Sequence, residues 1–185
     1  MTPIKKIQNW MKKNTNDIFL INRTDEFLSE YIADYAERLK WISNFSGSAG
    51  RAIIEQEKAY LFVDGRYTTQ ANQEVDSNFF VIKHFHDYWL HLKQYKKDNK
   101  IIALDPLLHS VKEVENIQKF FINTKIILNY LEKNPIDINW NNQPPRPNSK
   151  AFFHGEKYAG ENIWSKIDRI QKIVQLKFVD FYLLS

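Results

Sequence analysis

Apolar positions recur at helical spacing near the start of the chain and then give way to short β-rich runs. Ile4, Ile7 and Met11 fall on one face of a helix that Thr2 and Pro3 are suited to begin, so residues 3–14 are predicted to be helical. The short apolar runs are predicted to be strands over residues 17–22, 51–55, 59–64, 79–83, 101–104 and 125–128. Helical patterns lie between them over residues 35–45, 66–74, 86–97 and 111–122.

The order of these elements indicates the fold class. Only residues 56–58 separate the runs 51–55 and 59–64, which favours a tight antiparallel hairpin. The remaining strands alternate with helices, as in domains that contain parallel pairs. We therefore expect an α/β domain with a mixed sheet flanked by helices.

The composition changes after Ile138, and this change predicts the domain organisation. Residues 139–150 are polar and contain prolines at 144, 145 and 147, which is typical of a stiff linker. Residues 160–177 have a helical apolar pattern, and residues 178–184 are predicted to be a strand. One helix and one strand cannot enclose a core. We expect a first domain over residues 1–138, a linker over 139–150, and the truncated start of a second, similar domain over 151–185.

Composition excludes several classes of protein. The 185 residues are 43% hydrophobic and 26% charged, which is typical of a folded domain rather than a disordered chain. No apolar stretch reaches the roughly 18 residues of a membrane span, and no signal peptide is recognisable. Cysteine is absent, which rules out disulfides and thiol chemistry and is compatible with a reducing cytoplasm. The net charge of +4 does not by itself indicate a nucleic-acid partner.

Two small motifs suggest chemistry, but each has a simpler structural explanation. His84 and His86 lie two residues apart near a strand end and could share a metal with His91 or Asp87, although a surface pair without a metal is the favoured interpretation. Residues 46–50 (SGSAG) have neither the frame of a phosphate loop nor that of a nucleophile elbow. A tight turn that brings two stretches of backbone together is expected there instead.

A basic stretch suggests nucleic-acid binding as one alternative function. It combines lysines with stacking-competent aromatic residues, namely Lys93, Lys96, Lys97, Lys100, Tyr88, Trp89 and Tyr95. Lysines at the carboxyl end of a helix are also stabilised by the helix dipole, and this explanation is favoured.

The segment Asp64-Gly65-Arg66-Tyr67 is the most informative candidate. A glycine after a strand allows a sharp change of direction that would present Arg66 and Tyr67 at a sheet end, where α/β proteins commonly bind ligands. Alternatively, Arg66 forms only a salt bridge with Asp64. The residues alone leave both interpretations open.

Several segments taken together resemble the N-terminal domain of Xaa-Pro aminopeptidases, within the creatinase and aminopeptidase P group. The resemblance rests on residues 23–26, 29–32, 37–50, 62–71, 104–106, 144–147 and 158–161. It implies a creatinase N-terminal-like fold, followed in the large members by a second related domain and a catalytic "pita-bread" domain. That catalytic domain binds two divalent metal ions, with manganese expected, and no segment of this chain matches its ligand set.

The resemblance also implies a function. The full-length protein would release the N-terminal residue from peptides with proline in second position, as a cytoplasmic homodimer without a nucleic-acid or membrane partner. This chain would contribute substrate gating and assembly, with no catalytic residue and no metal ligand of its own. Arg66 matches a residue that reaches the bound peptide, whereas Tyr67 receives no role. The alternative is a non-catalytic peptide- or protein-binding module of the same fold, and metal ligands downstream of Ser185 would distinguish the two.

Overall fold

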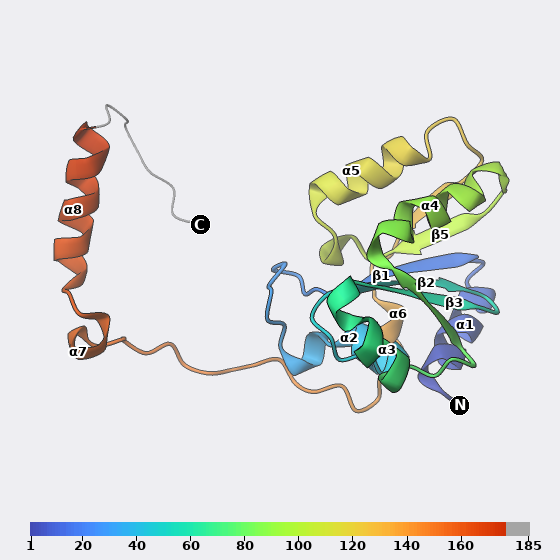
Figure 1. The fold of residues 1–185 in the computed structure, drawn as a ribbon, viewed down its shortest axis with the longest axis horizontal. Coiled ribbons are helices and arrows are strands. Elements are labelled where there is room, and N and C mark those ends of the chain that lie inside the picture. Colours follow the sequence, from blue (N-terminus) through green and yellow to red (C-terminus); the bar gives the residue numbers. More distant parts are fainter. Residues whose placement is uncertain (177–185) are drawn as a thin grey trace. The chain divides into compact units, whose positions relative to one another are not determined.

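The computed structural model describes residues 1–176, which form two compact units divided after Pro147 (Figure 1). The strands of the first unit are β1 (Ile18–Asn22), β2 (Gly50–Glu55), β3 (Ala59–Val63), β4 (Phe80–His84), β5 (Ile101–Leu104) and β6 (Ile127–Tyr130). Its α-helices are α1 (Pro3–Lys13), α2 (Arg38–Ser43), α3 (Thr68–Glu74), α4 (Tyr88–Lys93), α5 (Val111–Phe120) and α6 (Pro135–Asn139). The second unit contains α7 (Glu156–Ala159) and α8 (Ile163–Leu176).

The strands form one mixed sheet in the order β4-β3-β2-β1-β5-β6. Strand β2 is antiparallel to both β1 and β3, and the pairs β3–β4, β1–β5 and β5–β6 are parallel. In the β2–β3 hairpin, Gly50 lies opposite Val63 and Ile54 lies opposite Ala59. The predicted mixed sheet and its hairpin are therefore confirmed.

Helices cover both faces of the sheet, so the unit has three layers (Figure 1). All five residues of β1 are buried, as expected for a central strand with a helix layer on each side. Phe19 and Ile21 belong to one hydrophobic core with α1, α2, α3 and α6, whereas Ile18 and Leu20 belong to the other with α4 and α5. The alternation along one strand thus divides the apolar side chains between two cores.

Three predicted helices, including residues 66–74, are divided by 3₁₀ turns in the structure. Residues 35–45 form a 3₁₀ turn over Asp34–Ala36 and then α2, because Glu37 leaves helical geometry with a ψ of 49°. Its carboxylate pairs with Arg23 Nη2 at 3.0 Å, a contact that no local pattern reveals. Residues 86–97 likewise divide into α4 between two 3₁₀ turns.

The first unit continues to Pro147, past the expected boundary at residue 138. Helix α6 was not predicted from the sequence, although Asn134 caps it by accepting a hydrogen bond from Ile136 N at 3.0 Å. Beyond α6, Trp140 stacks on Trp41 with ring centroids 5.8 Å apart. We call residues 140–147 the strap, because this first part of the predicted linker is held against the domain.

The second unit, taken by itself, is a short helix followed by α8. The predicted helix over residues 160–177 corresponds to α8, and within the described part of the chain no residue of α8 is buried. Its apolar side chains include Ile163 and Trp164, which are 65% and 70% exposed. The strand predicted over residues 178–184 lies outside the described residues. Among the helices that the structure describes, none is long and apolar enough to span a membrane.

Trypsin is expected to cleave this chain first after Lys150. Residues 148–155, at the start of the second unit, are exposed and belong to no helix or strand, which makes their backbone accessible to a protease. The bond after Arg146 should resist, because Pro147 follows it and Arg146 itself is held by Glu26. Mass spectrometry of early digestion products would identify the sites, and a first cut between residues 18 and 130 would contradict this picture.

Candidate functional site

One end of the sheet gathers most of the segments that the sequence singles out. Because β1, β3, β4, β5 and β6 run in one direction and β2 in the other, the carboxyl ends of the first group lie beside the start of β2. After β1 the chain continues to β2, which lies on one side of β1 in the sheet. After β5 it continues to β6, which lies on the opposite side of the sheet from β2. Ligands of α/β sheets commonly bind at such a switch in strand order. The segments at this end are residues 23–26, 46–49, 64–67, 84–86 and 105–108.

Arg66 stands exposed at this end, next to the carboxyl end of β3. Asp64 Oδ1 accepts hydrogen bonds from Arg66 N at 3.0 Å and from Arg66 Nε at 2.8 Å. The hydrogen bond from the Arg66 side chain, aided by the one from its backbone, lowers the pKa of the Asp64 carboxyl, and the same pair raises the pKa of Arg66. The Arg66 side chain is nevertheless 75% exposed. Asp64 therefore orients the guanidinium through Nε and leaves its terminal nitrogens facing solvent.

The neighbouring turn is rigid because its backbone lies on an aromatic ring. A Cβ on Gly47 would stand 2.3 Å from the Phe45 ring, which is itself buried, so only glycine fits. Tyr67 lies edge-on to Phe45 at 5.9 Å, and its hydroxyl lies 2.5 Å from Ser48 Oγ. The close approach expected here is therefore between the Gly47 backbone and an aromatic side chain, not between two stretches of backbone. Tyr67 helps to join that turn to the segment bearing Arg66.

Helix α3, which follows Arg66, is tied to the same turn. The Glu74 carboxylate accepts hydrogen bonds from Ser46 N at 2.8 Å and from Ser46 Oγ at 2.7 Å. Burial raises the pKa of Glu74, but the hydrogen bonds from Ser46 and Gln70 outweigh it, so the net shift is downward. Both sides of the Arg66 segment are thus fixed by buried or hydrogen-bonded contacts.

The two histidines at the end of β4 do not form part of a recognisable metal centre. The rings of His84 and His86 stack with centroids 4.7 Å apart, and His84 Nδ1 accepts a hydrogen bond from His86 N at 3.4 Å. His91 is buried elsewhere, with Nε2 3.0 Å from the Tyr95 hydroxyl. Burial, followed by the nearby Lys83, lowers the pKa of His91. Within residues 1–176, no group of three or more potential ligands is placed to hold a metal.

The basic stretch offers few of the aromatic faces that nucleic-acid binding would need. Tyr88 and Tyr95 are buried in the core, with 2% and 4% exposure, so neither can stack on a base. Lys96 lies over the ring of Phe120 at 3.9 Å, and Trp89 packs against that ring at 5.1 Å. These contacts hold α4 and the 3₁₀ turn after it against α5, and they do not favour the nucleic-acid alternative.

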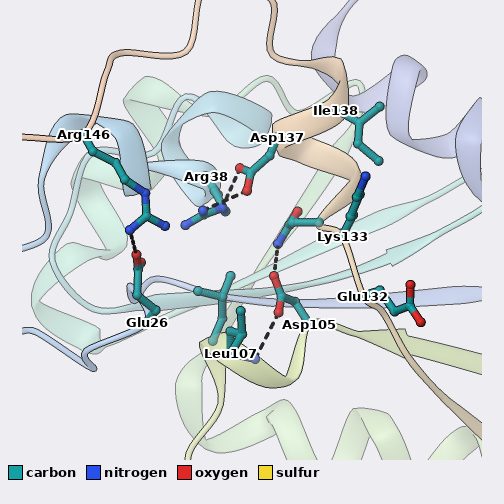
Figure 2. Close-up of a pocket in the computed structure, with 11 residues that line it drawn as sticks. Glu26, Arg38, Asp105, Leu107, Glu132, Lys133, Asp137, Ile138 and Arg146 are labelled. Atoms are coloured by element: carbon teal, nitrogen blue, oxygen red, sulfur yellow. Dashed lines mark hydrogen bonds and ion pairs between the residues drawn. The ribbon is translucent and has the colours of Figure 1, made fainter.

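A second feature of this end is a cleft of about 360 Å³ beyond the carboxyl ends of β1, β5 and β6 (Figure 2). Charged side chains line it from several elements: Glu26, Arg38, Asp105, Glu132, Lys133, Asp137 and Arg146. Arg38, on α2, is 5% exposed and makes a bidentate pair with Asp137, with distances of 2.8 and 2.9 Å. Such a pair fixes α2 to α6 with defined geometry.

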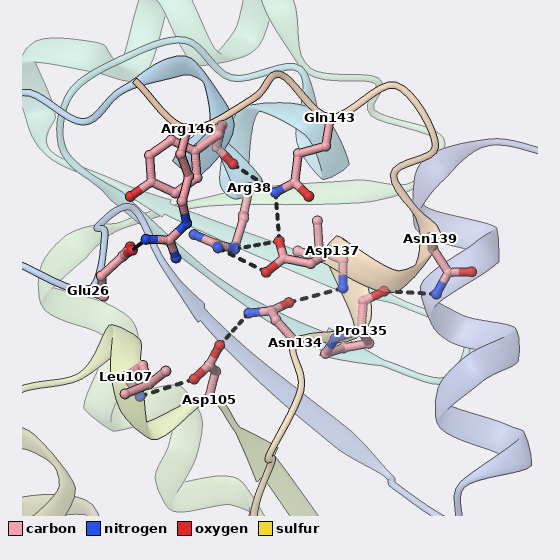
Figure 3. Close-up of polar contacts among 12 residues, drawn as sticks. Glu26, Arg38, Asp105, Leu107, Asn134, Pro135, Asp137, Asn139, Gln143 and Arg146 are labelled. Carbon is pink, nitrogen blue, oxygen red and sulfur yellow. Dashed lines mark hydrogen bonds and ion pairs between the residues drawn. The ribbon is translucent and has the colours of Figure 1, made fainter. Parts of the chain in front are cut away.

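Other polar contacts of this cleft hold Asp105 to Asn134, at 2.9 Å, and fasten the strap (Figure 3). Gln143 Nε2 donates to the carbonyl oxygen of Tyr35 at 2.8 Å and to Asp137 Oδ1 at 2.9 Å. Arg146 Nη1 lies 2.5 Å from Glu26 Oε1, and its guanidinium lies 4.9 Å from the Tyr35 ring centroid. Burial raises the pKa of Glu26, but hydrogen bonds and the charges of Arg146 and Arg38 outweigh burial, so the net shift of this pKa is downward. Glu26, Arg38, Asp137 and Arg146 therefore serve the architecture of the domain.

Comparison with known proteins identifies the fold family. Residues 3–128 match the family model of the creatinase/prolidase N-terminal domain. This chain belongs to that family. The match covers the whole sheet up to the start of β6, and with it the end of the sheet that bears Arg66.

Curated relatives of this creatinase/prolidase N-terminal domain are named probable Xaa-Pro aminopeptidase P. The protein from Podospora anserina is 34% identical over 185 residues, which cover 97% of this chain and 27% of the relative. The one from Coprinopsis cinerea is 33% identical and matches 90% of this chain and 28% of the relative. The chain thus spans about a quarter of the length of the curated relatives it matches.

Solved structures show the same fold. The X-prolyl aminopeptidase from Caenorhabditis elegans, described as a cytosolic enzyme with a di-nuclear active site, matches 96% of this chain and 31% of its own with a TM-score of 0.79 and 22% identity. The N-terminal domain of the peptidase PepQ from Mycobacterium tuberculosis matches 74% of this chain and 96% of its own, with a TM-score of 0.56 and 17% identity. The predicted creatinase N-terminal-like fold is confirmed.

Replacing Gly47 by alanine should destabilise the first unit, because the new methyl group would overlap the buried Phe45 ring. Overpacking of this kind costs about 1–3 kcal/mol, and we expect a lower midpoint in urea or thermal unfolding. Gly155→Ala is the matched control, since a Cβ there meets nothing within 4 Å. Equal stability of the two variants would show that the turn is not fixed by Phe45.

Proposed function

We propose that this chain is the N-terminal, non-catalytic part of an Xaa-Pro aminopeptidase, which releases the first residue of peptides with proline in second position. Support comes from its family membership and from curated relatives that match nearly all of the chain while being more than three times as long. A cytoplasmic homodimer remains our expectation for the full-length protein. The role assigned to this chain is to help gate and hold the peptide and to take part in assembly.

Catalysis is assigned to the part of the protein outside this chain. The described residues do not fit a metal centre, because no three potential ligands converge within residues 1–176. The Caenorhabditis elegans neighbour is described as having a di-nuclear active site. By analogy we place two divalent metal ions, with manganese expected, in the downstream catalytic domain. No chemical step is assigned to residues of this chain.

Arg66 is the residue that we assign to peptide binding. Its guanidinium is exposed, it is aimed by Asp64, and it stands on a sheet end that the Gly47 turn makes rigid. Proline lacks an amide N–H, so the carbonyl oxygens and the terminal carboxylate of a proline-containing peptide are the main groups that an enzyme can bind by hydrogen bonds. Arginine supplies donors in a planar fork that suits such oxygens. The geometry of Arg66 supports a binding role and does not support a chemical one.

In the full-length protein, Arg66→Ala should lower kcat/KM for a proline-second peptide by about tenfold to a hundredfold, because one charge-assisted hydrogen bond is lost. The melting temperature and the metal content should be unchanged, since Arg66 contacts solvent on most of its surface. Arg66→Lys should recover only part of the loss, because lysine keeps the charge without the fork.

Arg169→Ala is a suitable control for this experiment. Arg169 is also an exposed arginine, 61% accessible, and it also pairs with a nearby carboxylate, that of Glu161. Its removal should leave kcat/KM unchanged. Unaltered kinetics in a folded, metal-loaded Arg66→Ala enzyme would exclude the assignment, and a lower melting temperature with a matching loss of activity would make Arg66 structural.

A further inference from the structure

His91, on α4, is a buried titratable residue that neither the Arg66 end of the sheet nor the strap uses. Its side chain is enclosed between α4 and the sheet, with 3% exposure, and its ring lies 4.1 Å from the ring of Tyr60 on β3. Both ring nitrogens have partners: Nδ1 is 3.2 Å from Lys83 Nζ on β4, and Nε2 is 3.0 Å from the Tyr95 hydroxyl. Tyr95 belongs to the 3₁₀ turn Gln94–Lys97, which follows α4 directly.

These contacts form a chain of hydrogen bonds that has only one possible direction. Beyond His91, the Tyr95 hydroxyl donates to Oε1 of Glu55, the last residue of β2, at 2.6 Å. An ammonium group only donates hydrogen bonds and a carboxylate only accepts them. The chain therefore runs from Lys83 through His91 and Tyr95 to Glu55, which requires a hydrogen on Nε2 of His91 and none on Nδ1. Neutral His91 in this way connects β4 to β2 through α4 and the turn after it.

A second proton on His91 has no acceptor in this chain. It would sit on Nδ1 and point an N–H at the Lys83 ammonium group, which is itself only a donor. Burial and the charge of Lys83 lower the pKa of His91 and outweigh Glu55, which raises it. The titratable groups that face His91 or its partners come from every neighbouring element: Lys83 on β4, Tyr60 on β3, Glu55 on β2, Tyr95 on the turn, and Asp98 and Lys100 beside Tyr95.

Helix α4 depends strongly on these contacts. It has only six residues, Tyr88–Lys93, which is too short for a helix to be stable without tertiary packing. Its buried residues are Tyr88, His91 and Leu92, so His91 is one of three side chains that hold it to the sheet. Loss of the His91 contacts would also free Tyr95 from one of its two hydrogen-bond partners.

We propose that His91 is an acid-sensitive switch: when it takes up a proton, α4 and the turn Gln94–Lys97 detach from the sheet, while the opposite face of the sheet stays folded. Because the pKa of His91 is lower in the folded chain than its ordinary value of 6.5, the stability that neutral His91 contributes is complete above that value. It is lost as the pH falls below 6.5 towards the lowered pKa. Only residues of the first unit are needed, so the switch does not depend on the proposed peptidase function.

The first test compares the pH dependence of urea unfolding in the 185-residue chain and in His91→Gln, since glutamine keeps a donor and an acceptor but does not titrate. Between about pH 7.5 and 5.5, above the ordinary carboxyl range, the unfolding equilibrium constant of the wild type should rise by up to about tenfold more than that of the variant. His86→Gln, which removes an exposed histidine of the same unit, should match the wild type. Equal pH dependence in the wild type and His91→Gln would overturn the proposal.

Hydrogen–deuterium exchange locates the effect within the wild-type chain. After correction for the intrinsic pH dependence of exchange, residues 85–97 should exchange several-fold faster at the lower pH than at the higher one. Residues 3–13, which form α1 and pack on the other core, should change much less. Exchange that rises equally in both segments, or in neither, would contradict a local release of α4.

Lys83→Met provides an independent variant if His91→Gln does not fold. Methionine keeps the length and apolar contacts of the side chain and removes the ammonium group that faces Nδ1. In an NMR titration, the His91 ring should protonate at a lower pH in the folded wild type than in the urea-unfolded chain, and Lys83→Met should move that midpoint upward. A His91 ring that titrates alike in both states, or a midpoint that Lys83→Met leaves in place, would count against the switch.

Discussion

The pairing of β1 with two differently oriented neighbours is the constraint on which this structure depends. Its side chains alternate between two apolar cores, so burial alone does not fix the strand register against a shift along the chain. Polar contacts at both ends of β1 fix its register instead. Asp17 Oδ2 accepts from Ile101 N at 2.8 Å at the start of the strand, and Asn22 binds Glu113 at its end. With β1 fixed between antiparallel β2 and parallel β5, the two halves of the sheet are joined in one defined register.

This arrangement explains why one end of the sheet carries the features that suit binding. Carboxyl ends of parallel strands deliver loops to the same edge, and the reversed strand β2 brings the Gly47 turn there as well. The turn packs on buried Phe45 and contacts Tyr67, so Arg66 projects from a rigid base although its own side chain is exposed. In this way Phe45, Gly47 and Tyr67, which contribute no chemistry, can position the Arg66 cation for a ligand whose other contacts lie elsewhere.

Local pattern was sufficient for much of this fold. The hairpin of β2 and β3 and the mixed sheet follow from short apolar runs and the spacing between them. The glycine after the second run singled out the Arg66 segment, and the resemblance supplied the expected role of Arg66. The strap was missed because its contacts join residues far apart in the chain, such as Tyr35 with Gln143 and Trp41 with Trp140. Proline-rich composition indicated an extended backbone but not what that backbone packs against. The exposure of Arg66 likewise depends on tertiary packing.

The central claim is that the Arg66 end of this domain meets the peptide in the assembled enzyme. The most direct measurement places a photoreactive amino acid at position 66 of the full-length protein and maps its crosslinks to a bound, uncleaved proline-second peptide. The account predicts a crosslink to the peptide from position 66 and none from position 119, which lies on α5 and is also exposed. Crosslinks of equal yield at both positions, or none at position 66 while the peptide is bound, would contradict it.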